Sequence, residues 1–592
     1  MNPKLQLMLQ EAYQYFQGGN LTKTEKILKE FLKVLPKNFD ALHLLAIVYA
    51  SQAKHHEAII FYEALVELGF YDALVLNNYG SSLNAIGKNE EAILVFKKAL
   101  EIDPHDPELW YNAGNVHCDL ARHEEALFYY EQSIQLSPKY FQAYSNYGKA
   151  LFDLKRYPEA LTYYDIALSI SPLFVDCLIN KGVTLHELKR FDEAIAHHDK
   201  ALSLKPDYAQ PWSNKGNTLH ELKRFDEAIA HHDKALSLKP DYAQAYLHKG
   251  NTLHELKLYE QAIAHFDKAL ILNPDYAEAW SNKAMLNLFL KNFQSGWENY
   301  DWRLKIKDMK PKTTVERLVL WSGSSCKNLL ITSEQGVGDI IFYASMFSLM
   351  KSRVGNITFS TDIRLLPILA RAFPDIVFIS SDAPLDASLY DAQIPLGSLP
   401  YVMSMNPDIA GRRVPYLIDN KVFTKSLISN SFSEKLLRCG VAWKSNNQKL
   451  GHNKSVLLSD LIDILQVEGY EFINLQYGDT QQEIRDLEIN HGVTLKTIEG
   501  VDLFNNIDGL LSIIQTCDLI VTTSNVTAHL AGALGKTTFL LVPYSTGRIW
   551  YWHEEDISSW YPSISLYSQG QNYEWSGAIK DIASRLKSEL FK

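Results

Sequence analysis

A period of 34 residues runs through the N-terminal half of this 592-residue chain and constrains its fold more than any other feature. Pro36 starts the series, and Phe70 occupies the one slot where the proline is missing. The other prolines are Pro104, Pro138, Pro172, Pro206, Pro240 and Pro274. A fixed period of this length indicates one small unit copied many times, in which each copy buries its apolar face against its neighbours. The sequence therefore predicts a superhelical array in this half of the chain.

Small residues fill two more slots of the same frame. Glycine recurs at Gly80, Gly114, Gly148, Gly182, Gly216 and Gly250, and alanine at Ala58, Ala92, Ala126, Ala160, Ala194, Ala228 and Ala262. Positions of this kind let the two helices of a hairpin approach closely. A 34-residue helix–turn–helix unit with this pattern is typical of the tetratricopeptide repeat. We predict eight or nine such repeats over residues 1–305.

The unit that begins at Asp275 departs from the pattern. Its second helix carries Trp297, Tyr300 and Trp302. Aromatic side chains bury large apolar areas, so we expect these three to pack the array against the next domain. A stiff joint between array and domain follows from this expectation.

Histidines are common in the array and invite a comparison with metal sites. They include His186, His197, His198, His220, His231 and His232. They repeat with a duplicated stretch of sequence, and no carboxylate accompanies them at the spacing of metal ligands. We interpret them as partly exposed helix residues and expect no metal site.

A file of asparagines occupies the slot two residues before the small residue of the first helix. Its members are Asn78, Asn112, Asn146, Asn180, Asn214 and Asn282, with His248 in the remaining place. An amide both donates and accepts hydrogen bonds, so such a file can hold the backbone of an extended peptide. The alternative is a slot that prefers an amide for structural reasons. The file resembles the asparagine ladder of the eukaryotic O-linked N-acetylglucosamine transferase, which implies a protein or peptide acceptor.

Beyond a lysine-rich connection at 305–312 the 34-residue period stops, and short apolar strands alternate with helices. Over residues 306–435 we predict strands at 328–332, 357–360, 376–380 and 391–394, and helices from 339 to Met350 and at 365–372. Over residues 436–592 we predict strands from Cys439 and at 471–476, 494–498, 519–521 and 537–542, and helices at 457–465, 481–487, 506–516 and 576–590. Alternation of this kind indicates parallel sheets covered by helices. Two Rossmann-like α/β lobes are expected, the first of them reduced.

The stretch from Leu519 to Lys536 is a buried strand that leads directly into a helix. Ser524, Asn525 and Thr527 lie at the start of that helix, where free N–H groups and the helix dipole favour an anion. The motif S-N-x-T-x-H-L-A-G-A-L-G-K resembles the donor-site corner of bacterial GT-B glycosyltransferases related to the heptosyltransferases. The resemblance is greatest to the branch in which a tetratricopeptide array precedes the transferase.

That resemblance implies the fold and the activity. The fold class is α plus α/β: an all-α superhelix followed by a two-lobed GT-B module, in which the C-terminal helix crosses back onto the first lobe. The implied activity is the transfer of a sugar from a nucleotide-sugar donor, which would bind in the second lobe. His529 would reach the donor phosphates, although a lone helix histidine can equally be a packing residue.

The loop Glu334 to Asp339 resembles the first-lobe loop of the same family. The resemblance assigns Asp339 as the general base, since the acceptor must lose a proton as the glycosyl bond forms. Glu334 is the reserve candidate, and a plain helix cap is the alternative for Asp339. Gly336 and Gly338 would let the backbone approach a ligand.

Further donor-binding residues are expected at the ends of other strands. Lys444 and Lys454 lie where the related transferases place cations that face the donor phosphates, and Gln476 and Tyr477 could meet the base or ribose. Ser524 stands where the heptosyltransferases carry aspartate, so that carboxylate's role cannot be transferred. No Asp-x-Asp motif occurs in the sequence, and we expect metal-independent transfer with no cofactor. An aromatic string could stack on base or sugar, or pack the lobes: Arg548, Trp550, Tyr551, Trp552, Trp560 and Tyr561.

Composition limits the kinds of partner and the cellular location that we expect for this protein. A net charge of −11 gives no support to a nucleic-acid partner, and no run of apolar residues is long enough to span a membrane. Five scattered cysteines without a Cys-x-x-Cys pair suit a reducing cytoplasm. The favoured function is a protein glycosyltransferase. The alternatives are a transferase acting on a glycan or lipid precursor, and a scaffold whose transferase lobes are inactive.

Overall fold

A computed structural model describes residues 3–306, 315, 317–411, 415–432, 436–447 and 451–590 of the chain. It divides into two compact units, Met1–Pro240 and Asp241–Lys592. The division falls inside the repeats, so the last repeat helices belong to the same unit as the α/β part. Among the described residues, no helix combines the length and the apolar character needed to cross a bilayer.

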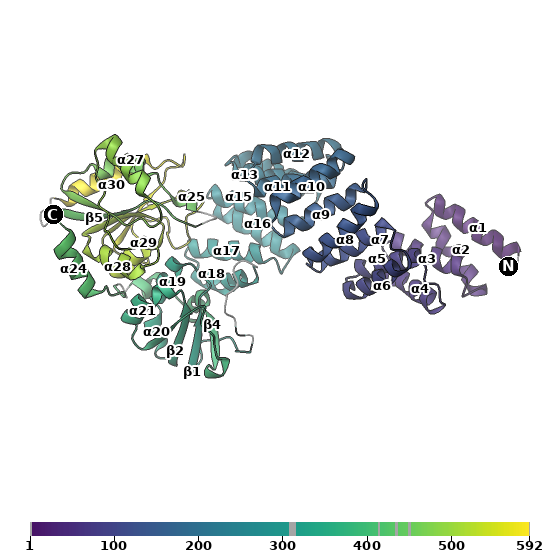
Figure 1. Ribbon diagram of the computed structural model, residues 1–592, viewed down its shortest axis with the longest axis horizontal. Helices are drawn as coiled ribbons and strands as arrows, with labels where there is room; N and C mark the ends of the chain where they lie inside the picture. Colours follow the sequence, from purple (N-terminus) through teal and green to yellow (C-terminus); the bar gives the residue numbers. More distant parts are fainter. Residues whose placement is uncertain are drawn as a thin grey trace. The chain divides into compact units, whose positions relative to one another are not determined.

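The first unit is all-helical, and its helices pair in chain order as antiparallel hairpins (Figure 1). The helices are α1 (Pro3–Gln17), α2 (Leu21–Val34), α3 (Phe39–Ser51), α4 (His55–Glu67), α5 (Ala73–Ala85), α6 (Asn89–Ile102), α7 (Pro107–Asp119), α8 (His123–Leu136), α9 (Phe141–Asp153), α10 (Tyr157–Ile170), α11 (Val175–Glu187), α12 (Phe191–Leu204), α13 (Ala209–Glu221) and α14 (Phe225–Leu238). The predicted repeat architecture is confirmed for these residues.

The glycine slot is filled by a ring from the second helix of the same hairpin. A Cβ added at Gly114 would lie 2.7 Å from the Tyr130 ring, and one at Gly182 would lie 2.5 Å from the His198 ring. His198 and His232 are therefore fully buried in the slot that tyrosine or phenylalanine fills in other repeats. The interpretation of these two histidines as partly exposed is wrong, because the repeat frame places them in the core.

The second unit begins with the last repeat helices, which are α15 (Ala243–Glu255), α16 (Tyr259–Leu272), α17 (Ala277–Phe289) and α18 (Phe293–Tyr300), followed by the 3₁₀ helix η1 (Asp301–Lys305). Trp297 and Tyr300 are buried in one apolar core with residues of the first α/β lobe. The expected joint is confirmed for these two aromatics. Trp302 instead stacks on Trp280 of the array, with ring centroids 5.6 Å apart.

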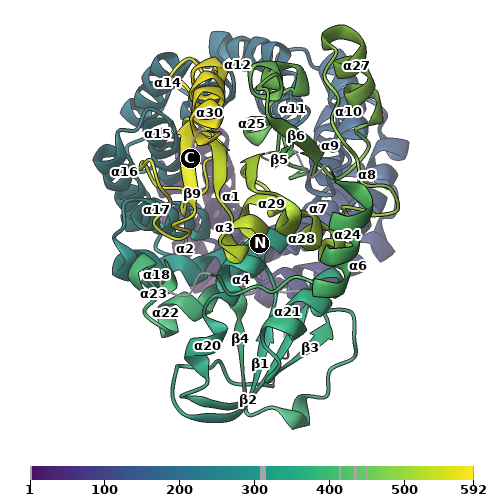
Figure 2. The same ribbon diagram turned by 90° about the vertical axis from the view of Figure 1, so that its left-hand side faces the viewer.

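The rest of this unit is built on two parallel sheets covered by helices. Figure 2 shows β1 to β4, which form one of the two sheets. The first sheet has the order β3-β2-β1-β4 and the second the order β6-β5-β7-β8-β9. The strands are β1 (Cys326–Thr332), β2 (Val354–Thr361), β3 (Ile376–Ser380), β4 (Ala392–Pro395), β5 (Leu437–Ala442), β6 (Tyr470–Asn474), β7 (Leu519–Thr523), β8 (Thr538–Val542) and β9 (Ile564–Ser568). Strand order reverses between β1 and β4 and between β5 and β7, and ligands of open α/β sheets bind at such points.

The helices of the first lobe are α19 (Val337–Ala344), α20 (Phe347–Met350), η3 (Ile363–Leu365), α21 (Leu366–Ala372), η4 (Ala387–Leu389), η5 (Leu396–Ser398), α22 (Leu399–Val402) and α23 (Pro407–Gly411). Those that follow are α24 (Lys421–Ser431), α25 (Gly451–Lys454), η6 (Leu458–Leu461), α26 (Ile462–Leu465), α27 (Gln481–His491), α28 (Ile507–Thr516), α29 (Val526–Leu534) and α30 (Ser576–Glu589). The α plus α/β class is confirmed.

Three local predictions need correction. The helix expected to continue to Met350 is interrupted between α19 and α20. The strand expected at 494–498 contributes a single bridge, from Lys496 to Ile473. The sequence pattern also missed α24 and β9.

The C-terminal helix α30 packs on the second lobe, so the expectation that it crosses back onto the first lobe is wrong. Its buried residues Ile579, Ile582 and Leu586 share an apolar core with second-lobe strands, and Tyr470 of β6 donates a hydrogen bond to the Leu586 carbonyl at 2.9 Å. The lobes meet instead through α19 and α29, which contribute to one continuous core.

Candidate active site

A cavity of about 290 Å³ lies between the lobes, beside segments that follow β1 and β2 of the first sheet and β5, β6 and β7 of the second, where the strand order of the second sheet reverses. The first lobe lines it with the start of α19 and with Arg364. The second lobe lines it with loops that follow β5, β6 and β7 and with the start of α29. Eight of the predicted site residues line it: Gly336, Gly338, Asp339, Lys454, Tyr477, Ser524, Asn525 and His529.

Asp339 lies in the first turn of α19 and is the carboxylate of the cavity. Burial raises its pKa, while a hydrogen bond from Tyr551 and the ammonium of Lys454 act in the opposite direction. The Tyr551 hydroxyl donates to Asp339 Oδ1 at 3.0 Å. A carboxylate with a raised pKa is a better proton acceptor than an exposed one.

A chain of hydrogen bonds continues from Asp339 into the core. His529 Nε2 lies 3.2 Å from the Tyr551 hydroxyl, and His529 Nδ1 lies 3.3 Å from the Tyr561 hydroxyl. Tyr561 in turn lies 3.3 Å from the hydroxyl of Tyr416, which donates to the Ile341 carbonyl at 2.8 Å. Burial, aided by Lys454, lowers the pKa of His529 to about 3, so the imidazole is neutral.

The protons of this chain can be assigned in two ways. With Asp339 ionised, Tyr551 donates to it, His529 donates from Nε2 and accepts at Nδ1, and the contact between Tyr561 and Tyr416 is left without a proton. With Asp339 protonated, its O–H donates to Tyr551, and Tyr551 donates to His529 Nε2. His529 then donates from Nδ1 to Tyr561, and Tyr561 donates to Tyr416. Each contact between these side chains then contains one proton. The chain therefore accommodates a proton on Asp339 through a change of histidine tautomer.

Lys454 ends the short helix α25, and its side chain lines the cavity. The residue is only 6% exposed, and no hydrogen bond or ion pair of its ammonium is found among the described residues. Burial lowers its pKa, which the carboxylate of Asp339 partly offsets. A buried, unpaired cation is costly unless a ligand anion pairs with it. Lys454 therefore gives the cavity a cation with no protein partner among the described residues.

The corner between β7 and α29 has the geometry of a capped helix start. Asn525 Oδ1 accepts from the Thr527 N–H at 2.9 Å, and Asn525 Nδ2 donates to the Lys444 carbonyl at 3.1 Å, which ties the two strand ends together. Ser524 Oγ accepts from the Trp552 indole N–H at 2.9 Å. Thr527 is fully buried and lies outside the cavity lining.

Aromatic side chains also line the cavity. Tyr477 and Phe504 face each other with ring centroids 6.1 Å apart, and the Arg364 guanidinium lies 4.8 Å from the Phe504 ring centre. Asp362 holds that guanidinium through two of its nitrogens. Sequence reasoning missed Arg364 and Phe504. Arg364 could have been found, because it follows β2 at the carboxyl edge where ligands of parallel sheets bind.

Two further donor candidates do not reach the cavity. The ammonium of Lys444 pairs with Glu483 and lines a different hollow. Gln476 is buried, and its Oε1 accepts from the backbone N–H groups of Trp443 and Lys444, so it fixes the end of β5. Glu334, the reserve base, is also turned away and pairs with Arg303.

Gly338 serves helix packing as well as ligand access. A Cβ added there would lie 2.7 Å from His529 Cδ2, so only glycine lets α19 approach α29 this closely. The aromatic string is mainly packing. Trp550, Trp552, Trp560 and Tyr561 are buried against Phe342 of α19 and its surroundings, and Tyr551 alone of the string lines the cavity. Among the described residues, no cluster of three or more potential metal ligands is found.

The asparagine file is half-buried and partly engaged between repeats. In three cases the amide NH₂ donates to a side chain of the preceding repeat: Asn112 to Asn77, Asn146 to Asn115, and Asn282 to Asn251, at 2.8 to 2.9 Å. Asn214 Nδ2 is buried with no partner among the described residues. Three amides of the file are therefore already engaged in hydrogen bonds within the array.

Comparison with known protein families identifies repeats in several segments of the chain. Family models described as TPR repeat match residues 80–120 and 216–257, and models described as Tetratricopeptide repeat match residues 107–140, 139–207 and 243–276. Protein FlbA of Caulobacter vibrioides is 27% identical over 334 residues, which are 51% of this chain and 54% of FlbA. The chain thus matches about half the length of that curated relative.

Two of the solved structures that match this chain do so at low overall similarity. The APC/C hetero-tetramer Cut9–Hcn1 gives a TM-score of 0.38 at 21% identity, covering 47% of this chain and 55% of that one. PilF of Pseudomonas aeruginosa gives a TM-score of 0.32 at 20% identity, covering 36% and 96%. Together with the helical hairpins, the matched segments identify the N-terminal part of the chain as an array of tetratricopeptide repeats.

Proposed function

We propose that this chain is a glycosyltransferase that moves a sugar from a nucleotide-sugar donor to a protein acceptor held by the repeats. The observation that supports this most is the presence of Asp339 and Lys454 in the lining of one interlobe cavity. A proton acceptor and an unpaired cation are the two groups that such a transfer needs. The unpaired cysteines suit a reducing compartment, such as the cytoplasm.

In the proposed reaction an acceptor hydroxyl or amide attacks the anomeric carbon of the donor sugar. The new glycosyl bond forms as the bond between that carbon and the phosphate oxygen breaks. Asp339 takes the acceptor's proton, and the negative charge goes to the departing nucleoside diphosphate. Lys454 and the N-terminal end of α29 stabilise that charge. The aromatic pair Tyr477 and Phe504 offers flat apolar surface to a nucleoside base.

The experiment that tests this function uses nucleotide sugars whose nucleoside is uridine, guanosine, cytidine or deoxythymidine. Each is added to the full chain in EDTA, and thermal unfolding and nucleoside diphosphate release are measured. A bound donor at 100 times its Kd stabilises by about 2.7 kcal/mol. Asp339→Asn is expected to keep that shift and to release product more slowly by a factor on the order of 10² to 10⁴.

Absence of a thermal shift with every donor would contradict the proposal and leave a protein-interaction scaffold. Equal loss of binding and turnover in Asp339→Asn would instead make Asp339 a structural cap. One observation favours a second candidate, a transferase that acts on a glycan or lipid precursor. Amides of the asparagine file already bond to neighbouring repeats, so the file can be explained without a peptide.

A further inference from the structure

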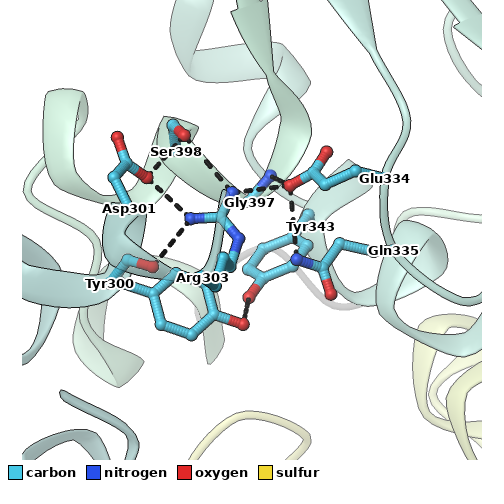
Figure 3. A network of polar contacts seen from close by, with 8 residues as sticks. All are labelled: Tyr300, Asp301, Arg303, Glu334, Gln335, Tyr343, Gly397 and Ser398. Atoms are coloured by element: carbon cyan, nitrogen blue, oxygen red, sulfur yellow. Dashed lines mark hydrogen bonds and ion pairs between the residues drawn. The ribbon is translucent and has the colours of Figure 1, made fainter. Parts of the chain in front are cut away.

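A buried ion pair joins the end of the repeats to the loop that carries Asp339 (Figure 3). Arg303 of η1 donates from Nη2 to Glu334 Oε1 at 2.6 Å, and the two side chains are 3% and 1% exposed. The same guanidinium donates from Nη1 to Asp301 Oδ1 at 2.6 Å and to the Tyr300 carbonyl at 3.1 Å. Arg303 is thereby fixed to the array on one side and to Glu334 on the other.

Glu334 Oε1 accepts three hydrogen bonds. Besides Arg303 it accepts the Gly397 N–H at 2.8 Å and Gln335 Nε2 at 3.2 Å. A Cβ at Gly397 would lie 2.7 Å from all three of these polar side chains, so glycine is needed there. Only four residues separate Glu334 from Asp339 along the chain, so the carboxylate anchors the start of the catalytic loop.

A second tie runs to the helix that follows the loop. The Tyr343 hydroxyl donates to the Tyr300 hydroxyl at 3.4 Å. Tyr343 lies one turn after Asp339 on α19, and residues four apart share a helix face. The last residues of the array therefore hold the Asp339 segment both before it, through Glu334, and after it, through Tyr343.

We propose that Arg303 is a positioning residue: through Glu334 it makes the end of the repeat array hold Asp339 in the cavity. The catalytic part of this inference rests on the proposed function, since it assigns Asp339 the role of base. Coupling of this kind makes the array part of the active-site scaffold in addition to any part it plays in binding an acceptor.

Stability alone is a poor explanation for this pair. A buried ion pair often contributes less than an apolar replacement of the same volume. Here the pair is also incompletely satisfied, because Arg303 Nε and Glu334 Oε2 are buried without hydrogen-bond partners among the described residues. The pair instead fixes the position of the loop that begins at Glu334, because the guanidinium and the carboxylate accept only a narrow range of relative orientations.

The test compares Arg303→Met with Arg371→Met in the full chain. Arg371 pairs with Asp508 at 2.8 Å between the lobes and has no hydrogen bond or ion pair with the Asp339 loop among the described residues, so it is a control for the loss of an arginine–carboxylate pair, here a more exposed one. Arg303→Met is expected to leave the Kd for nucleoside diphosphate unchanged and to lower kcat by a factor on the order of 10², the effect of misplacing a catalytic group by about 1 Å. Arg371→Met should change neither quantity.

A second measurement does not depend on activity. Hydrogen exchange of peptides that contain residues 334–343 should be at least about tenfold faster in Arg303→Met and unaltered in Arg371→Met. If the wild-type chain binds no nucleotide sugar, the proposed function fails while this exchange result still tests the anchoring. Wild-type exchange and kcat in Arg303→Met would overturn the inference.

The double variant Arg303→Met with Glu334→Met separates positioning from stability. It removes both buried charges, so its thermal unfolding should return toward wild type, whereas kcat should stay low because the bond to Gly397 is also lost. Recovery of kcat together with stability would make the pair merely structural. If Arg303→Met alone does not fold, the double variant provides both the kinetic and the exchange measurements.

Discussion

Replacement of Lys454 by methionine is the change with the most distinctive expected outcome. Methionine keeps much of the side-chain volume and removes the charge. The Lys454 residue is buried, its ammonium has no partner among the described residues, and burial lowers its pKa below 10.5. The unfolded chain prefers the charged form more strongly than the folded one, so the lysine costs stability at every pH below about 10.5. Lys454→Met should therefore raise the free energy of unfolding at pH 7.

The same change should weaken the binding of a nucleoside diphosphate. A hydrogen bond to a charged group contributes about 1.5–3 kcal/mol, so the Kd should rise roughly 10- to 150-fold. Isothermal titration calorimetry measures this loss, and thermal unfolding without ligand measures the gain in stability. The gain should shrink as the pH rises through the lowered pKa of the folded protein and vanish above about 10.5, because the lysine is then neutral in both states.

Lys444→Met is the matched control for this experiment. Lys444 pairs with Glu483 away from the cavity and is 36% exposed, so its loss should change stability by no more than about 1 kcal/mol. Its Kd for nucleoside diphosphate should equal that of the wild type. Equal Kd values for wild type and Lys454→Met would refute the phosphate assignment, as would a Lys454→Met protein less stable than the wild type.

Three further predictions follow. Tyr551→Phe removes the hydroxyl that lowers the pKa of Asp339, so the acid limb of kcat/KM should move to higher pH; an unmoved limb would contradict the contact. Burial lowers the pKa of His198 from 6.5 to about 3, so protonation of the unfolded chain should cost about 2 kcal/mol of stability between pH 8 and pH 5. His198→Phe should abolish that loss in thermal unfolding, and an equal loss in both proteins would refute the buried neutral histidine. In the asparagine file, Asn180→Ala with Asn214→Ala changes two of the three positions for which no bond to a preceding repeat is found among the described residues; this double variant should raise the acceptor KM at unchanged stability, and an unchanged KM would favour the glycan or lipid acceptor.

The sequence by itself determined the repeats and most of the strands. The 34-residue period specified the helical hairpins, because each unit is stabilised by contacts within itself and with its neighbours. The strand and helix pattern also located the β7–α29 corner and the Asp339 loop, since a parallel strand followed by a helix is a local arrangement with a strong apolar signal. Ser524, Asn525 and Asp339 were found in this way.

Only the tertiary structure decided which side chains share the cavity. Lys444 and Lys454 are equivalent as sequence signals, yet Glu483 of α27 draws one away while the other is buried unpaired. Glu334 and Asp339 lie in one loop, and a partner at the end of the array turns the first aside. Local patterns specify elements, but side-chain direction in a loop depends on what distant segments place beside it. His198 is the converse case, in which a polar residue is buried because the repeat frame, rather than its own chemistry, sets its place.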